Sequence, residues 1–282
     1  MPKMSAEQSS PICIEEAVMI LAIDIGNTTI VVGILEREKI KTSWRLWTDR
    51  QRLADEYGGQ ICELLRISEV PRHDFEGIII SSVVPPVLRE FVMMCKRFFQ
   101  ITPIIVSTQE ELGLELRSDY PEEVGADRIA TAVGGYHEYG GPLIVVDFGT
   151  ATTFDAVSAD GAYLGGVIAP GIRISMDALF DRTALLRRVD LSPPTNIIGK
   201  NTNDCIRSGF YYGFLGQMEE IIRRIKLELS EEAKVIATGG LAELIAKDSE
   251  LVDGIDSELM LKGLQILYHR ILNARSEGEG CK

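Results

Sequence analysis

Two similar stretches of sequence lie almost half a chain apart, and this repeat constrains the fold more than any other feature. The first reads Asp24-Ile-Gly-Asn-Thr-Thr-Ile and the second reads Asp147-Phe-Gly-Thr-Ala-Thr-Thr-Phe, each directly after a short apolar run. The two aspartates are 123 residues apart (147 − 24), which indicates a duplicated domain and not a short-period solenoid. The repeat predicts an N-terminal domain over 19–140 and a C-terminal domain over 141–282, preceded by an N-terminal extension over 1–18.

Strand-like and helix-like segments alternate along the chain. Short apolar runs predict strands, whereas apolar residues at helical spacing predict helices. We expect strands at 19–23, 30–35, 44–47, 77–84, 103–106, 142–146, 163–168 and 233–237. We expect helices at 53–65, 87–99, 122–139, 172–186, 205–229 and 259–272. This alternation predicts an α/β protein.

An Asp-x-Gly turn between two strands suits phosphate chemistry. Glycine lets a ligand approach the backbone closely, and the amides of a tight turn form a concavity that binds anions. The aspartate can hold a cation, since Mg²⁺ commonly takes one or two carboxylates together with phosphate oxygens. An ordinary β-turn is the simpler interpretation of one such motif. Two copies, with Thr238-Gly239-Gly240 after another strand, favour a clamp for a polyphosphate between two domains.

Composition argues against several kinds of partner and site. The 42 acidic and 29 basic residues give a formal charge of −13, unlike the basic face of a nucleic-acid-binding protein, and anionic membranes repel that charge. No apolar run reaches the ~20 residues of a membrane span, and residues 1–18 do not resemble a signal peptide. Five cysteines without a CxxC pair fit reduced thiols. We therefore expect a cytoplasmic protein without a nucleic-acid or membrane partner.

The sequence lacks the two commonest phosphate signatures and resembles a different family. Neither GxxxxGK[ST] nor a helix-opening GxGxxG is present. Two Asp-x-Gly turns and a late Thr-Gly-Gly resemble the acetate/sugar kinase, Hsp70 and actin superfamily, whose members have two ribonuclease-H-like (actin-like) domains with a nucleotide cleft between them. The resemblance to type III pantothenate kinases is closer and covers residues 19 to about 272. It rests on Asp24-Ile-Gly-Asn-Thr, Ala54-Asp55-Glu56-Tyr57, Ser81-Ser82-Val83-Val84-Pro85, Gly125-Ala126-Asp127-Arg128, Asp147-Phe-Gly-Thr-Ala-Thr-Thr, Gly165-Gly166-Val-Ile-Ala-Pro-Gly171, Asn201-Thr202 and Thr238-Gly239-Gly240.

The resemblance implies a homodimeric kinase that phosphorylates pantothenate with ATP to 4′-phosphopantothenate, the first step of coenzyme A synthesis. It assigns the catalytic base to Asp127, and it assigns to Asp147 a monovalent cation, K⁺ or NH₄⁺, which acts beside Mg²⁺. The residues implied to bind ATP are Asp24, Ile25, Gly26, Asn27, Thr28, Thr29, Ile30, Val31 and Thr150. Those implied to bind pantothenate are Tyr120, Gly125, Ala126, Asp127, Arg128 and Thr202 of the partner subunit.

Simpler roles stay open for the charged residues of this set. Asp127 begins an expected helix, where an acid is stabilising through the helix dipole. Arg128 either forms a surface ion pair or grips a carboxylate with two hydrogen bonds. Asp24 and Asp147 could be turn residues only. An unpaired charge after an apolar strand is costly, however, and this favours a cation or phosphate role.

Other roles and functions also stay open. Tyr120 could simply pack, and Thr202 could act as a helix N-cap without touching a ligand. Another small-molecule kinase or a phosphatase of the same fold is a second interpretation, against which Gly125–Arg128 argues. An ATP-binding regulatory protein, such as an accessory factor for transcription, is a third, because actin-like clefts also serve as switches.

Overall fold

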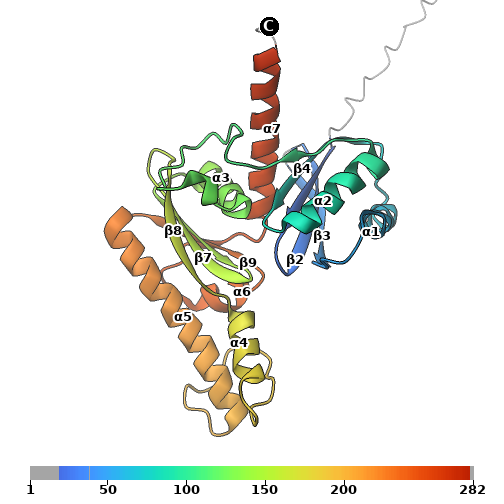
Figure 1. Ribbon diagram of the computed structural model, residues 1–282. Helices are drawn as coiled ribbons and strands as arrows, with labels where there is room; N and C mark the ends of the chain where they lie inside the picture. The colour runs from blue at the N-terminus through green and yellow to red at the C-terminus, as the bar shows by residue number, and fades with distance from the viewer. Residues whose placement is uncertain (1–18, 38, 280–282) are drawn as a thin grey trace, which may run out of the picture.

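The computed structural model describes residues 19–37 and 39–279, and these form two five-stranded sheets with helices around them (Figure 1). The extension expected over 1–18 lies outside the described residues. The first sheet contains β1 Met19–Ile25, β2 Thr29–Glu36, β3 Lys39–Trp47, β4 Phe75–Ser82 and β5 Ile104–Ile105. The second contains β6 Leu143–Phe148, β7 Ala151–Val157, β8 Tyr163–Pro170, β9 Lys234–Gly239 and β10 Gly254–Ile255.

The two sheets repeat one topology. The strand orders are β3-β2-β1-β4-β5 and β10-β9-β6-β7-β8. In each sheet the first three strands form an antiparallel meander, and the last two pair in parallel beside the first. Asp24 and Asp147 are each the last residue but one of the leading strand of their sheet. The duplicated α/β architecture predicted from the repeat is confirmed, while the boundary at residues 140 and 141 stays a prediction.

Seven α-helices belong to the described part of the chain: α1 Ala54–Ile67, α2 Pro85–Met94, α3 Ala126–Tyr139, α4 Ile172–Asp181, α5 Thr202–Leu229, α6 Ala242–Ile245 and α7 Leu259–Glu279. None of them is long and apolar enough to cross a membrane. The short elements α6 and β10, of four and two residues, have no counterpart among the sequence predictions.

Three expected helices have different limits in the structure. The helix expected at 122–139 begins only at Ala126, because Pro121 starts a 3₁₀ turn and Val124 is extended (φ −71°, ψ 120°). The helix expected at 172–186 ends at Asp181, since Leu185 is 91% exposed and no core holds a further turn. The helix expected at 87–99 changes to a π-helical turn over Cys95–Phe99.

Helices α3 and α7 pack closely against each other and connect the cores of the two sheets. A Cβ at Gly134 would lie 2.6 Å from the carbonyl oxygen of Leu259, and one at Gly263 would collide with the carbonyl oxygen of Ala130. Glycine at both positions therefore lets the two backbones touch. Helix α7 also covers one face of the first sheet, where Leu264 joins Ile20 in one core cluster. Helix α3 packs on strands of both sheets.

Candidate active site

The two Asp-x-Gly turns meet each other in the folded chain. The hydroxyl oxygens of Thr28 and Thr150, from the turns after β1 and β6, lie 2.9 Å apart. The first turn is closed by a hydrogen bond of 3.1 Å from the Gly26 amide to the carbonyl oxygen of Thr29. The Thr48 hydroxyl donates to the carbonyl oxygen of Gly26 at 2.7 Å and so fixes the turn from β3. The repeat thus brings two potential anion-binding turns to one place.

The Thr238-Gly239-Gly240 segment lies directly against the second turn. Thr238 is opposite Asp147 in the parallel pairing of β9 and β6. Gly239 has a φ of +90°, and a Cβ at this position would collide with Oδ1 of Asp147. Glycine is therefore required there by both backbone conformation and space. All three motifs singled out in the sequence for phosphate binding lie at one site.

Asp24 and Asp147 are strongly perturbed carboxyl groups at the centre of this site. Burial and then the charge of Asp127 raise the pKa of Asp24 to about 7. The same two causes raise the pKa of Asp147 to about 7. Both side chains keep a little solvent exposure, but Oδ1 of Asp24 is buried and has no hydrogen-bond partner among the described residues. Two carboxylates in such surroundings call for a positive charge that the nearby side chains do not supply.

A Mg²⁺-bound polyphosphate fits these residues better than a metal held by protein alone. In the part of the chain that the structure describes, no group of three His, Cys, Asp or Glu side chains could hold a metal ion. Mg²⁺ needs no such group, because it takes one or two carboxylates and completes its shell with phosphate oxygens and water. The unpaired Oδ1 of Asp24 offers one oxygen of this kind.

Asp127 lies in the first turn of α3, beside both perturbed carboxyl groups. Its Oδ1 accepts a hydrogen bond of 2.8 Å from the backbone amide of Arg128. Its charge contributes to the raised pKa values of Asp24, Asp147 and Asp155, so Asp127 lies close to all three. The stabilising position in the helix and the position in the site are therefore compatible.

Gly125 makes room for the observed position of the Asp127 side chain. A Cβ at Gly125 would collide with Oδ1 of Asp127, although the backbone of Gly125 (φ −58°, ψ 140°) suits any residue. We expect Gly125→Ala to displace the carboxylate and lower kcat by about tenfold or more, with a small change in melting temperature. Gly59→Ala is the matched control, because no atom lies within 4 Å of a Cβ at this helical position. Equal activity of the two variants would contradict the prediction.

Arg128 belongs to a buried cluster, so a surface ion pair is the wrong interpretation of this residue. Its Nε donates to Oδ1 of Asp155 at 2.7 Å, and Nη2 lies at the same distance from that oxygen without the alignment of a hydrogen bond. The Asp155 side chain is fully buried, and the Tyr163 hydroxyl donates to the same Oδ1 at 2.8 Å. Burial raises the pKa of Asp155 to about 6, while the charge of Arg128 lowers it.

Two residues expected to bind pantothenate lie apart from this cluster. Tyr120 is 63% exposed and precedes the 3₁₀ turn. Thr202 begins α5, at the end of that helix that lies beside α4 and away from α3 (Figure 1). The N-cap is Asn201, whose side chain accepts from the Asp204 amide at 3.0 Å, so the alternative of Thr202 as the cap is wrong. The role of Thr202 in the site stays a prediction.

The residues expected to bind ATP differ in what they can offer. The side chains of Ile25 and Ile30 are fully buried in the core of the first sheet, so only their backbone groups could meet a phosphate. Asn27 is exposed at the tip of the first turn, and its Oδ1 accepts from Arg50 at 3.1 Å. Arg50 therefore brings a positive charge to this turn, which the sequence analysis missed.

Asp155 and Tyr163 were also missed by the sequence analysis. A signal for Asp155 was available, because an acid inside an apolar strand is costly unless it has a partner. Its partner comes from α3, 27 residues earlier, and no local pattern indicates that pairing. Tyr163 gave no signal beyond that of a strand residue.

Solved structures of low sequence identity share this whole fold. An activator of 2-hydroxyisocaproyl-CoA dehydratase from Clostridium difficile, with bound ADPNP, has a TM-score of 0.57 at 12% identity over 94% of this chain and 98% of that chain. A proposed Baf family transcriptional activator from Campylobacter jejuni has a TM-score of 0.57 at 21% identity, with coverage of 90% and 99%. A proposed 2-dehydro-3-deoxygalactonokinase from Sinorhizobium meliloti has 0.56 at 16%, with coverage of 89% and 96%. The fold is the two-domain architecture of actin-like kinases.

The family follows from the sequence itself. A family model described as type III pantothenate kinase matches residues 20–224, well over half of the chain. The chain belongs to the type III pantothenate kinase family and is an ATP-using phosphotransferase. The roles of the individual site residues stay predictions.

Proposed function

We propose that the protein transfers the γ-phosphoryl group of ATP to the primary hydroxyl of pantothenate and releases ADP and 4′-phosphopantothenate. The observation that supports this most is the position of Asp127, close enough to Asp24 and Asp147 for its charge to raise both pKa values. A base therefore lies beside the two turns that we propose to hold the phosphates. The product opens coenzyme A synthesis, and we propose that the reaction takes place in the cytoplasm.

Each group has a distinct task in the proposed reaction. The amides and hydroxyls of the two turns bind phosphate oxygens, and Asp24 and Asp147 face the cations, with the monovalent ion (K⁺ or NH₄⁺) at Asp147. Mg²⁺ neutralises charge on the phosphates when it is bound. Asp127 accepts the proton of the primary hydroxyl while that oxygen attacks the γ-phosphorus, and Arg128 binds the carboxylate of pantothenate.

The direct test of the reaction is pantothenate-dependent release of ADP. Purified protein is mixed with ATP, Mg²⁺ and a K⁺ salt, with and without pantothenate, and the phosphorylated product is identified by mass. We expect release to depend on both pantothenate and the K⁺ salt, with a Na⁺ salt as the comparison for the second. ATP binding without pantothenate-dependent release would reject the assignment and favour another acceptor or an ATP-binding regulatory role.

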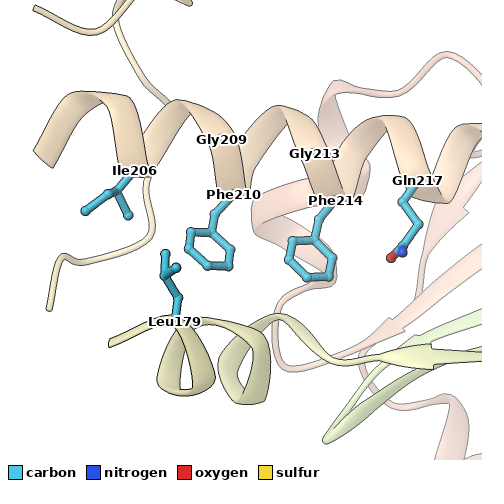
Figure 2. Close-up of a pocket in the computed structure, with 7 residues that line it drawn as sticks. All are labelled: Leu179, Ile206, Gly209, Phe210, Gly213, Phe214 and Gln217. Atoms are coloured by element: carbon cyan, nitrogen blue, oxygen red, sulfur yellow. The ribbon is translucent and has the colours of Figure 1, made fainter. Parts of the chain in front are cut away.

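We also propose that the active form is a homodimer in which helix α5 packs against its copy. Leu179 of α4 and six residues of α5 line a groove of about 410 Å³: Ile206, Gly209, Phe210, Gly213, Phe214 and Gln217 (Figure 2). No atom lies within 4 Å of a Cβ at Gly209, Gly213 or Gly216, so this face of α5 is open to close approach. A second copy would cover the groove and bring Thr202 of the partner subunit toward the site that this chain leaves without it.

A bulky charge in the groove should separate the subunits without harming the fold. We expect Gly213→Arg to give a particle of single-chain mass by light scattering, with an unchanged circular dichroism spectrum and a large loss of pantothenate-dependent activity. Gly59→Arg is the control, since it adds the same side chain at another exposed, open helical glycine. A wild-type protein of single-chain mass that turns over pantothenate normally would reject the dimer.

A further inference from the structure

The Arg128 guanidinium is held by a set of contacts that leave it one orientation. Asp155 accepts from Nε, and Tyr163 lies beneath the group, with its ring centroid 5.7 Å from the guanidinium carbon. Tyr163 donates to Oδ1 of Asp155, and the Thr153 hydroxyl donates to Oδ2 at 3.3 Å. A Cβ at Gly166 would lie 2.8 Å from Nη2, so this glycine leaves space for the guanidinium. The cluster therefore fixes a planar group and not only a charge.

Stability alone is a weak reason for this cluster. A buried ion pair gains little over apolar residues of the same size, because both charges lose their hydration. The Arg128 side chain is 16% exposed, whereas the Asp155 side chain is fully buried. Among the described residues, the Nη1 group has no protein acceptor, and Nη2 is buried without a hydrogen bond. Donors of the guanidinium are therefore left over beside Asp127, the adjacent residue.

We propose that Asp155 and Tyr163 are positioning residues that aim Arg128 at the carboxylate of the acceptor and so make the kinase specific for acid acceptors. This inference rests on the proposed function. Asp155 holds Nε, so that the outer edge of the guanidinium is presented to the ligand. An acceptor carboxylate bound at that edge places its hydroxyl end at a fixed distance from Asp127. Neither Asp155 nor Tyr163 touches the acceptor itself.

The test compares two acceptors that differ only in the group that Arg128 would bind. One is pantothenate, and the other is its alcohol analogue, with a hydroxymethyl group in place of the carboxylate. For Asp155→Asn we expect kcat/KM with pantothenate to fall by about tenfold or more, mainly through KM, since charge-assisted hydrogen bonds are the strong ones. With the alcohol analogue we expect a change of less than about threefold. A merely structural role would lower both values equally and would overturn the inference.

Two further variants keep the test decisive if Asp155→Asn folds poorly. Tyr163→Phe removes one donor to Asp155 and keeps the ring beneath Arg128, so we expect the same pattern with a smaller loss. Arg128→Lys keeps the charge but loses the planar shape, and we expect it to remove most of the preference for the carboxylate. An unchanged preference in both variants would overturn the inference while the wild type still uses pantothenate. A wild type inactive with pantothenate would instead reject the proposed function and, with it, this inference.

Discussion

Replacing Asp127 with asparagine should lower kcat for pantothenate phosphorylation by about 10²-fold or more and leave the fold intact. Asparagine keeps an oxygen at the position of Oδ1, which accepts from the Arg128 amide at 2.8 Å, so the first turn of α3 is preserved. What is lost is the group that we propose to take the hydroxyl proton. General bases typically contribute about 10²–10⁴ to a rate, although a loose phosphoryl transfer depends less on base help than many reactions.

The same variant should change the titration of its neighbours. The charge of Asp127 is the second cause of the raised pKa values of Asp24 and Asp147, so its removal should lower both. We therefore expect Asp127→Asn to bind ATP as well as the wild type and to melt at the same or a higher temperature. Glu138→Gln, in the last turn of the same helix, is the control and should keep full activity. Near-normal turnover by Asp127→Asn would show that another group takes the proton.

Asp147→Asn should make the ligand-free protein more stable at neutral pH, by roughly 2–4 kcal/mol, while abolishing most activity. The carboxyl group ionises at a pKa of about 7 in the folded chain and at 3.8 in the unfolded chain. Between these values the folded state binds more protons, so this group's contribution to stability falls as the pH rises from about 4 to about 7. Asparagine has no charge to lose and escapes this penalty.

The measurement is denaturant unfolding of both proteins from about pH 4 to about pH 8 without ATP or Mg²⁺. The two free energies of unfolding should agree at the acid end and separate progressively, with the variant above the wild type. Asp74→Asn, at an exposed position before β4, should run parallel to the wild type throughout. Mg²⁺ with ATP should then stabilise the wild type more than Asp147→Asn. Parallel curves for wild type and Asp147→Asn would mean that the folded protein already neutralises this carboxylate.

Much of the fold was predictable, because its main signals are local and occur twice. The apolar runs before Asp24 and Asp147 are leading strands, and the repeated turns after them meet through Thr28 and Thr150. Helix limits were harder where apolar spacing continues without a core, as at Leu185. The α4 prediction was too long for that reason.

The parts of the site that the sequence did not predict depend on contacts between distant segments. Asp155 gains its meaning only when β7 lies beside α3, and Tyr163 only when β8 lies beside β7. The pKa values of about 7 likewise require Asp24, Asp127 and Asp147 to come together. The sequence resemblance identified most of these positions, but their coupling is a property of the folded chain.

The packing of α7 on the first sheet bears on how the chain can fold during its synthesis. Leu264 and Leu267 of α7 belong to the same core cluster as Ile20 and Ile79, so the last helix covers strands that leave the ribosome first. About 240 residues separate these partners in sequence, and contacts of such long range form slowly. The early strands must therefore wait with one apolar face uncovered until translation ends, which is when a nascent chain is most exposed to aggregation. A ribosome that stalls before Leu259 would release a chain that cannot bury that face.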